Sequence, residues 1–136
     1  MRVNVDEQIR LGRKVDENTV LWWGKQPDNV REEALGDHNR ESLQDFTNKL
    51  NRFLVGTDRV WAQGPVFDIV ILENLYRQLQ KPAPWLYYNI RDSRTLLKAL
   101  GDDRKNEAGL LHNALEDCIS QAKAVQSALK RHNLQT

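Results

Sequence analysis

A histidine and an aspartate lie five positions apart at the start of the last long helical segment, in the stretch HNALED at residues 112–117. An imidazole with an ordinary pKa of about 6.5 can accept a proton close to neutral pH. A carboxylate is a preferred ligand for hard divalent cations. His112 and Asp117 could therefore serve one cleft, although the spacing alone favours a solvated helix N-terminus with an acid placed well for the helix dipole.

The second chemically informative stretch is VWAQGPVFD, at residues 60–68. Its first half predicts a strand, Gly64-Pro65 predicts a turn, and Asp68 falls in the first turn of the helix that follows. Ligands of α/β proteins usually bind at the carboxyl ends of strands, and Asp68 would lie there. Without the C-terminal motif, an ordinary first-turn helix aspartate would be the better interpretation.

A third stretch, NIRDSRTL at residues 89–96, joins a second strand to its helix. Arg91 and Asp92 could form a structural ion pair, or Arg91 could contact a phosphate. The structural interpretation is favoured.

Taken together and in this order, the three stretches resemble the DEDD-type 3'-5' exonucleases of the histidine-bearing, DnaQ-like branch, and most closely the bacteriophage DexA-like subgroup. The run Leu21-Trp22-Trp23 and the pair Arg94-Thr95 after Arg91-Asp92 carry the same resemblance. It therefore extends over nearly the whole chain.

This resemblance implies an α/β, ribonuclease H-like fold in which four carboxylates hold two divalent ions, Mg²⁺ or Mn²⁺. Two such ions can stabilise both the attacking and the leaving oxygen of a phosphodiester displacement. Residue by residue, the resemblance implies that Asp68 and Asp117 are metal ligands and catalytic residues, and that His112 is the general base. The substrate would be the 3' end of single-stranded DNA or RNA. Four further residues are expected to contact it: Gln63, Phe67, Arg91 and Trp22.

Members of this family begin with a strand that bears Asp-x-Glu, and its two acids are ligands to both ions. This sequence has no such pair, because Asp6-Glu7 and Asp16-Glu17 are adjacent acids that would point to different faces. We therefore expect an N-terminally truncated exonuclease fold that lacks the first strands of its central sheet and has an incomplete two-metal site. The strand near 59–63 would then have an exposed edge, which a homodimer or another chain could cover.

Composition limits the remaining possibilities. The 136 residues suffice for a single exonuclease-like domain spanning residues 1–136. With 20 Lys and Arg against 19 Asp and Glu, any polyanion site must be local. No apolar run is long enough for a membrane span or a secretory signal, so no membrane contact and a cytoplasmic location are expected. Cys118, the single cysteine, excludes an internal disulfide and is expected to be a small buried residue.

Hydrophobic periodicity predicts two strand-helix units with flanking helices. Strands are expected at 59–63 and 85–90. Helices are expected at 40–55, 67–80, 93–101 and from Leu111 onward, where Leu115, Cys118 and Val125 belong to one apolar stripe. A short helix through Trp22 and Trp23 would be capped by Asn18 or Thr19.

Two classes of function remain open, together with a third alternative, a phage or prophage remnant that has no function. One is a metal-dependent 3'-5' exonuclease that is inactive in isolation if its Asp-x-Glu motif is not supplied from elsewhere. Retention of Asp68, His112 and Asp117 favours this class. The other is a non-catalytic nucleic-acid- or protein-binding remnant of an exonuclease, of phage or prophage origin. The absent motif favours that second class.

Overall fold

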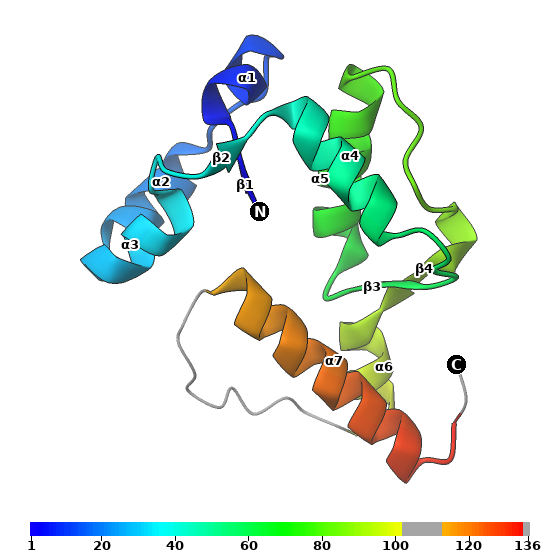
Figure 1. The fold of residues 1–136 in the computed structure, drawn as a ribbon. Coiled ribbons are helices and arrows are strands. Elements are labelled where there is room, and N and C mark those ends of the chain that lie inside the picture. Colours follow the sequence, from blue (N-terminus) through cyan, green and yellow to red (C-terminus); the bar gives the residue numbers. More distant parts are fainter. Residues whose placement is uncertain (102–112, 135–136) are drawn as a thin grey trace. The chain divides into compact units, whose positions relative to one another are not determined.

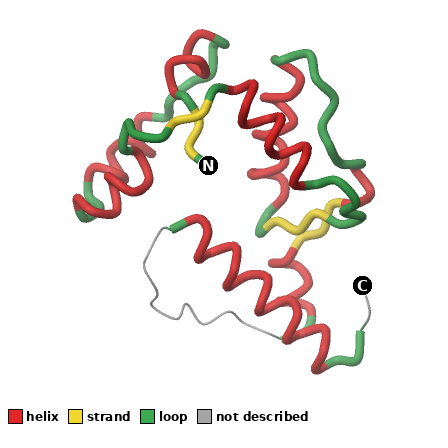
Figure 2. Tube along the Cα trace, viewed as in Figure 1, coloured by secondary structure: helices red, strands yellow, loops and turns green. Residues whose placement is uncertain are grey.

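A computed structural model describes residues 1–101 and 113–134 of the chain. The chain divides into two compact units, one built on Met1–Val55 with Asn113 and the other on residues 56–101 and 114–134. Helices predominate in both, and each contains one short pair of strands (Figure 2).

The first unit contains two parallel strands, β1 (Arg2–Val3) and β2 (Arg40–Glu41), and four helices. The helices are α1 (Val5–Arg10), α2 (Glu17–Gly24), α3 (Asp28–Leu35) and α4 (Leu43–Phe53). The Glu7 carboxylate accepts a hydrogen bond of 2.7 Å from the amide of Leu43, which joins α1 to the start of α4. Leu43 and Thr47 are buried, whereas α1, α2 and α3 have no buried residue.

The start of α2 differs from the prediction. Asp16 is the N-cap, and its carboxylate accepts hydrogen bonds from both the amide and the hydroxyl of Thr19, at 2.7 and 2.9 Å. These bonds lower the pKa of Asp16. Thr19 is therefore the donor to the cap rather than the cap itself, because the three-residue spacing lets an aspartate reach the helix amides.

The second unit is built around two parallel strands, β3 (Val60–Ala62) and β4 (Ile90–Asp92), with Val60 beside Ile90 and Ala62 beside Asp92. Helix α5 (Pro65–Gln78) connects them, and α6 (Ser93–Ala99) and α7 (Ala114–Arg131) follow. Helix α5 contacts both strands, and α6 contacts β3 and α7 (Figure 1). The strand-helix-strand order and the parallel pairing agree with the predicted α/β class.

The aromatic segment before β4 is not the predicted strand over 85–90. Trp85 is buried, lies edge-on to the buried Tyr76 at a ring distance of 6.0 Å, and donates a 3.1 Å hydrogen bond to Glu73. Tyr87–Asn89 then form a short 3-10 turn, η1, before the strand begins at Ile90. Aromatic composition indicated a strand here, but packing of the Trp85 ring on α5 determines the local path.

Helix α7 is less buried than the predicted stripe implies. Val125 and Ala128 are buried, whereas Leu115 and Cys118, one turn apart, are exposed. The expectation of a buried Cys118 is therefore wrong. Among the described elements, α7 packs against α6.

Candidate active site at the ends of two parallel strands

The turn at Gly64 connects the carboxyl end of β3 to α5. Gly64 has φ +95° and ψ 68°, a left-handed conformation that is costly for residues with a Cβ. Pro65 then occupies the first position of α5, where its fixed φ suits a helix and its missing amide costs nothing. The Gly-Pro pair thus turns the chain sharply and starts the helix that carries Asp68.

Asp92 locks this turn to the start of α6. Its carboxylate accepts hydrogen bonds from the amide of Gly64 at 3.2 Å, the amide of Arg94 at 3.0 Å and the hydroxyl of Thr95 at 2.6 Å. The bond from Thr95 contributes most to lowering the pKa of Asp92, and the backbone donors lower it further. Asp92 is the N-cap of α6. Ser93 is buried and donates to the carbonyl of Ala62, so it also joins the two strands.

Arg91 and Asp92, the pair singled out in the sequence, have separate partners. The Nη1 group of Arg91 donates to the carbonyls of Tyr88 at 2.6 Å and Ile90 at 3.0 Å. Asp92 faces the Gly64 turn instead. Both residues thus have structural contacts, but they do not form the ion pair that the sequence suggested.

Asp68 lies in the first turn of α5 and is exposed. No side chain in the described part of the chain forms an ion pair or hydrogen bond with its carboxylate. A first-turn acid interacts favourably with the helix dipole but needs no neighbour there. The carboxylate is therefore available to a cation or a substrate next to the carboxyl end of β3.

Asp117 lies in the first turn of α7, in the same unit, and is also exposed. It too has no partner among residues 1–101 and 113–134. His112 lies outside the described residues, so its predicted role as a base stays a prediction. The structure thus provides two exposed carboxylates at helix starts, as the sequence analysis expected.

The remaining predicted substrate contacts are distributed between the two units. In the second unit, Gln63 follows β3 directly and Phe67 is 72% exposed on α5. In the first unit, Trp22 is 42% exposed and packs edge-on against Trp23, at a ring distance of 5.0 Å. Each of these side chains can be reached by a ligand, and their roles stay predictions.

Asp68 and Asp117 do not by themselves fit a two-metal site. Within residues 1–101 and 113–134, no three His, Cys, Asp or Glu side chains gather closely enough to hold a metal ion. A magnesium ion takes six ligands in nearly octahedral geometry, and Asp68 with Asp117 would supply few of them. Asp92, the other acid near the carboxyl ends of β3 and β4, has both carboxylate oxygens engaged by the protein.

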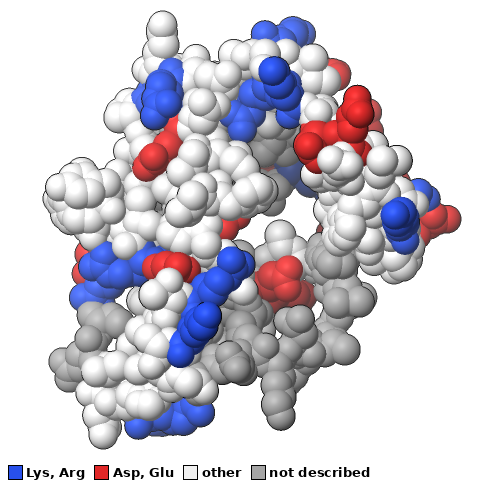
Figure 3. All heavy atoms as spheres, turned by 180° about the vertical axis from the view of Figure 1, so that it is seen from behind, with Lys and Arg blue, Asp and Glu red and all other residues white. Residues whose placement is uncertain are grey.

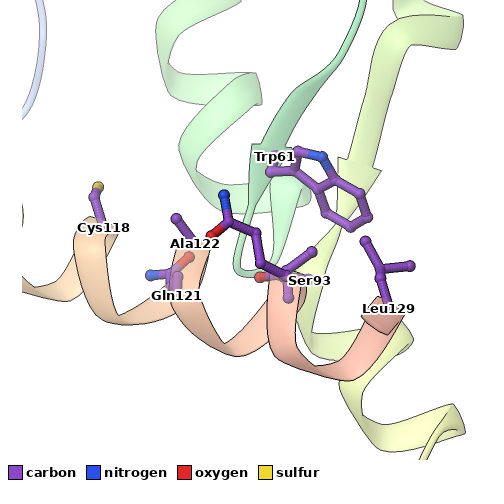
Figure 4. Close-up of a pocket in the computed structure, with 8 residues that line it drawn as sticks. Trp61, Ser93, Cys118, Gln121, Ala122 and Leu129 are labelled. Carbon is purple, nitrogen blue, oxygen red and sulfur yellow. The ribbon is translucent and has the colours of Figure 1, made fainter. Parts of the chain in front are cut away.

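A cavity of about 330 Å³ lies between β3, α6 and α7. Trp61 faces this cavity from β3, and Leu129 and Cys118 border it from α7 (Figure 4). Asp68 and Asp117 do not line it. The cavity is mostly apolar, so it is a gap in the packing of α7 on the sheet rather than part of the carboxylate site.

Arg94 is a residue of this region that the sequence analysis did not single out as a contact. Its Nη2 donates a long hydrogen bond of 3.4 Å to the carbonyl of Gln63, so its guanidinium lies at the Gly64 turn. The sequence signal was present in the stretch Arg91-Asp92-Ser93-Arg94. The sequence alone does not show whether Arg91 or Arg94 lies at the Gly64 turn. This depends on the path of the backbone, because β4 ends between the two residues.

Charged side chains are mixed over the surface. On the face shown in Figure 3, Lys and Arg alternate with Asp and Glu and form no continuous basic area. This agrees with a formal net charge of +1. None of the described helices is long and apolar enough to cross a membrane.

A family model described as "3'-5' exoribonuclease Rv2179c-like domain" matches residues 1–129, which is nearly the whole chain. Neither the curated proteins nor the solved structures yielded a match.

Proposed function

The chain belongs to the Rv2179c-like 3'-5' exoribonuclease family, and we propose that it hydrolyses terminal phosphodiester bonds at the 3' end of single-stranded nucleic acid. The observation that carries this proposal is the pair of exposed carboxylates, Asp68 and Asp117, each in the first turn of a helix of the same unit. Neither carboxylate has a structural partner among the described residues. An exposed carboxylate without a protein partner can bind a hard divalent cation.

The finer assignments follow the motifs in the sequence. We assign Asp68 and Asp117 as ligands of Mg²⁺ or Mn²⁺ and His112 as the general base, in a ribonuclease H-like fold closest to the DexA-like subgroup. A cytoplasmic location fits this chemistry. The parallel β3-α5-β4 unit supports the fold assignment, since it places Asp68 just beyond the carboxyl end of a strand.

The proposal requires further carboxylates, because Asp68 and Asp117 do not complete a metal site. These 136 residues contain no Asp-x-Glu pair. We propose that an extended segment bearing that pair comes from outside them, either from the same polypeptide or from a partner chain, and that it pairs with the free edge of β3. Among the described residues, β3 has a ladder partner only on the β4 side.

Exposed apolar side chains on α5, the helix that follows β3, support the same proposal. Val66 is 83% exposed and Phe67 72%, and Val70 follows on the same helix at 52%. An unpaired strand edge is a typical site for strand addition, and exposed apolar residues are typical of surfaces that another segment covers. A strand added to the free edge of β3 would pair with backbone N–H and C=O groups that otherwise face solvent.

The test is cleavage of a 3'-labelled single-stranded RNA in a titration with Mn²⁺ and Mg²⁺. It uses the chain alone and the chain joined at Met1 to a strand that carries the family's Asp-x-Glu motif. We expect activity at least in the joined protein, and its loss in both Asp117→Asn and Asp68→Asn. Asp58→Asn, at an exposed acid in the loop before β3, is the matched control and should retain activity. Absence of activity in both preparations would refute the assignment.

A second candidate function is nucleic-acid binding without cleavage. It is favoured by the lack of a three-ligand cluster in the described residues and by the exposed Trp22, whose ring could stack on a base. Binding of single-stranded RNA that persists in Asp117→Asn, with no cleavage in either preparation, would favour this candidate. If the chain does not bind single-stranded RNA, the candidate fails.

A further inference from the structure

The guanidinium of Arg94 packs on the backbone of the Gly64 turn. A methyl group placed on Gly64 would lie 3.6 Å from Nη1, 3.7 Å from Cζ and 3.8 Å from Nη2 of Arg94. Because these are ordinary van der Waals distances, the guanidinium of Arg94 lies directly against the turn. This places a positive charge at the point where β3 ends and α5, with Asp68 in its first turn, begins.

The positive charge of Arg94 is not neutralised by an acid within the described part of the protein. Among the described residues, Arg59 pairs with Asp58, and no ion pair to Arg94 is found. Arg94 is exposed, and the described contact of its guanidinium is the 3.4 Å bond to the carbonyl of Gln63. That contact uses one of five guanidinium donors and leaves the others available.

Arg91 offers a contrast in the same segment. Its Nη1 is engaged by two carbonyls at 2.6 and 3.0 Å, so reaching a ligand with that group would break existing bonds. The nearby acid that might have attracted Arg94, Asp92, accepts instead from Thr95, Gly64 and the main chain of Arg94. Of these two arginines, Arg94 is therefore the one whose guanidinium lies at the Gly64 turn without forming an ion pair with a described residue.

We propose that Arg94 binds a phosphate of the substrate strand and so positions its 3' end relative to Asp68. This inference rests on the proposed function and identifies a positioning residue for it. A guanidinium presents a planar fork of donors that matches two phosphate oxygens, which a lysine cannot reproduce. Its packing on Gly64 reduces the conformational freedom that binding would otherwise have to restrict.

The test is equilibrium binding of a 5'-fluorescein single-stranded RNA, followed by fluorescence anisotropy at several salt concentrations without added metal. We expect Arg94→Gln to weaken binding about tenfold, as for loss of one bidentate contact, and to reduce the salt slope by about 0.7. Arg94→Lys should keep most of the slope but recover only part of the affinity. Arg77→Gln is the matched control, because Arg77 is also exposed but lies in the last turn of α5, away from the Gly64 turn.

The outcomes separate this inference from the proposed function. If the wild-type chain binds RNA and Arg94→Gln binds equally well, the inference is wrong and the proposed function stands. Equal losses in Arg94→Gln and Arg77→Gln would mean that only net charge matters, which also contradicts the inference. If the wild-type chain does not bind RNA at all, the proposed substrate class fails and the inference fails with it.

Thermal melts of each variant report whether a loss of binding reflects unfolding. If Arg94→Gln does not fold, Arg94→Lys takes its place in the comparison with wild type. Weaker binding by folded Arg94→Lys would support the bidentate contact, and binding equal to that of wild type would overturn it.

Discussion

The carboxylate of Asp92 accepts a hydrogen bond of 3.2 Å from the amide of Gly64, across 28 residues of sequence. This bond joins the end of β3 to the start of α6 and holds the turn from which α5 begins. Asp92 therefore has a structural role in positioning Asp68 and Arg94, although it lies at the carboxyl end of a strand where catalytic acids are common. The hydrogen-bond partners of Asp92, rather than its place in the sequence, identify its role as structural.

Replacement of Asp92 by alanine should destabilise the second unit. The substitution removes the N-cap of α6 and the acceptor for Gly64, so the free energy of unfolding should fall by about 1–2 kcal/mol. Chemical denaturation measures this change. Asp58→Ala, at a solvent-exposed acid with one long contact to Arg59, should change stability by less than about 0.5 kcal/mol. Equal effects of the two substitutions would contradict the role assigned to Asp92.

The contribution of the Asp92 charge should depend on pH. Its hydrogen bonds hold its pKa below the ordinary value of 3.8, so its stabilisation is complete above that value and is lost as pH falls through the folded-state pKa. The stability difference between wild type and Asp92→Asn should therefore be constant from neutral to mildly acidic pH and should shrink in strong acid. Urea denaturation over that range measures it. A stability difference that grew as the pH fell would contradict the lowered pKa of Asp92.

Gly64→Ala should destabilise the protein through its backbone. The left-handed φ of +95° costs a residue with a Cβ about 1–2 kcal/mol, while the nearest atom, Arg94 Nη1, is at an ordinary contact distance of 3.6 Å. Gly24→Ala is the control, because Gly24 has no positive φ and nothing within 4 Å of an added methyl. It should be neutral or slightly stabilising. Thermal unfolding of both variants would show whether the cost is specific to position 64.

The thiol of Cys118 should react in the folded protein. The residue is exposed on α7 and is the single cysteine of the chain, so a maleimide should label one site per molecule without denaturant. Mass spectrometry of the labelled native protein measures this. Labelling that required denaturant would show that the first turns of α7 are covered in solution.

The sequence predicted the elements whose signals are local. The Gly-Pro turn and the alternating residues before it predicted β3 and α5 nearly to their observed bounds, Val60–Ala62 and Pro65–Gln78. The positions of Asp68 and Asp117 in first helical turns were predicted for the same reason.

Features that depend on packing could not be predicted in this way. The segment from Trp85 has strand-forming composition, but the contact of Trp85 with Tyr76 and Glu73 gives it another conformation. Likewise, the apolar spacing of α7 placed Cys118 on a buried stripe, but the residue is exposed in the structure. The role of Arg94 depended on where β4 ends, a boundary that propensity alone does not determine.

The direction and end-dependence of RNA cleavage test the proposed exonuclease function most directly. A 5'-labelled single-stranded RNA should be shortened stepwise from its 3' end in Mn²⁺ or Mg²⁺, at least by the chain joined to the Asp-x-Glu strand. A circular RNA of the same sequence should remain intact, because it has no 3' end. Shortening of the linear RNA alone, abolished by Asp68→Asn, is the predicted result. Cleavage of the circle, or no shortening of the linear RNA by either preparation, would contradict a 3'-5' exonuclease.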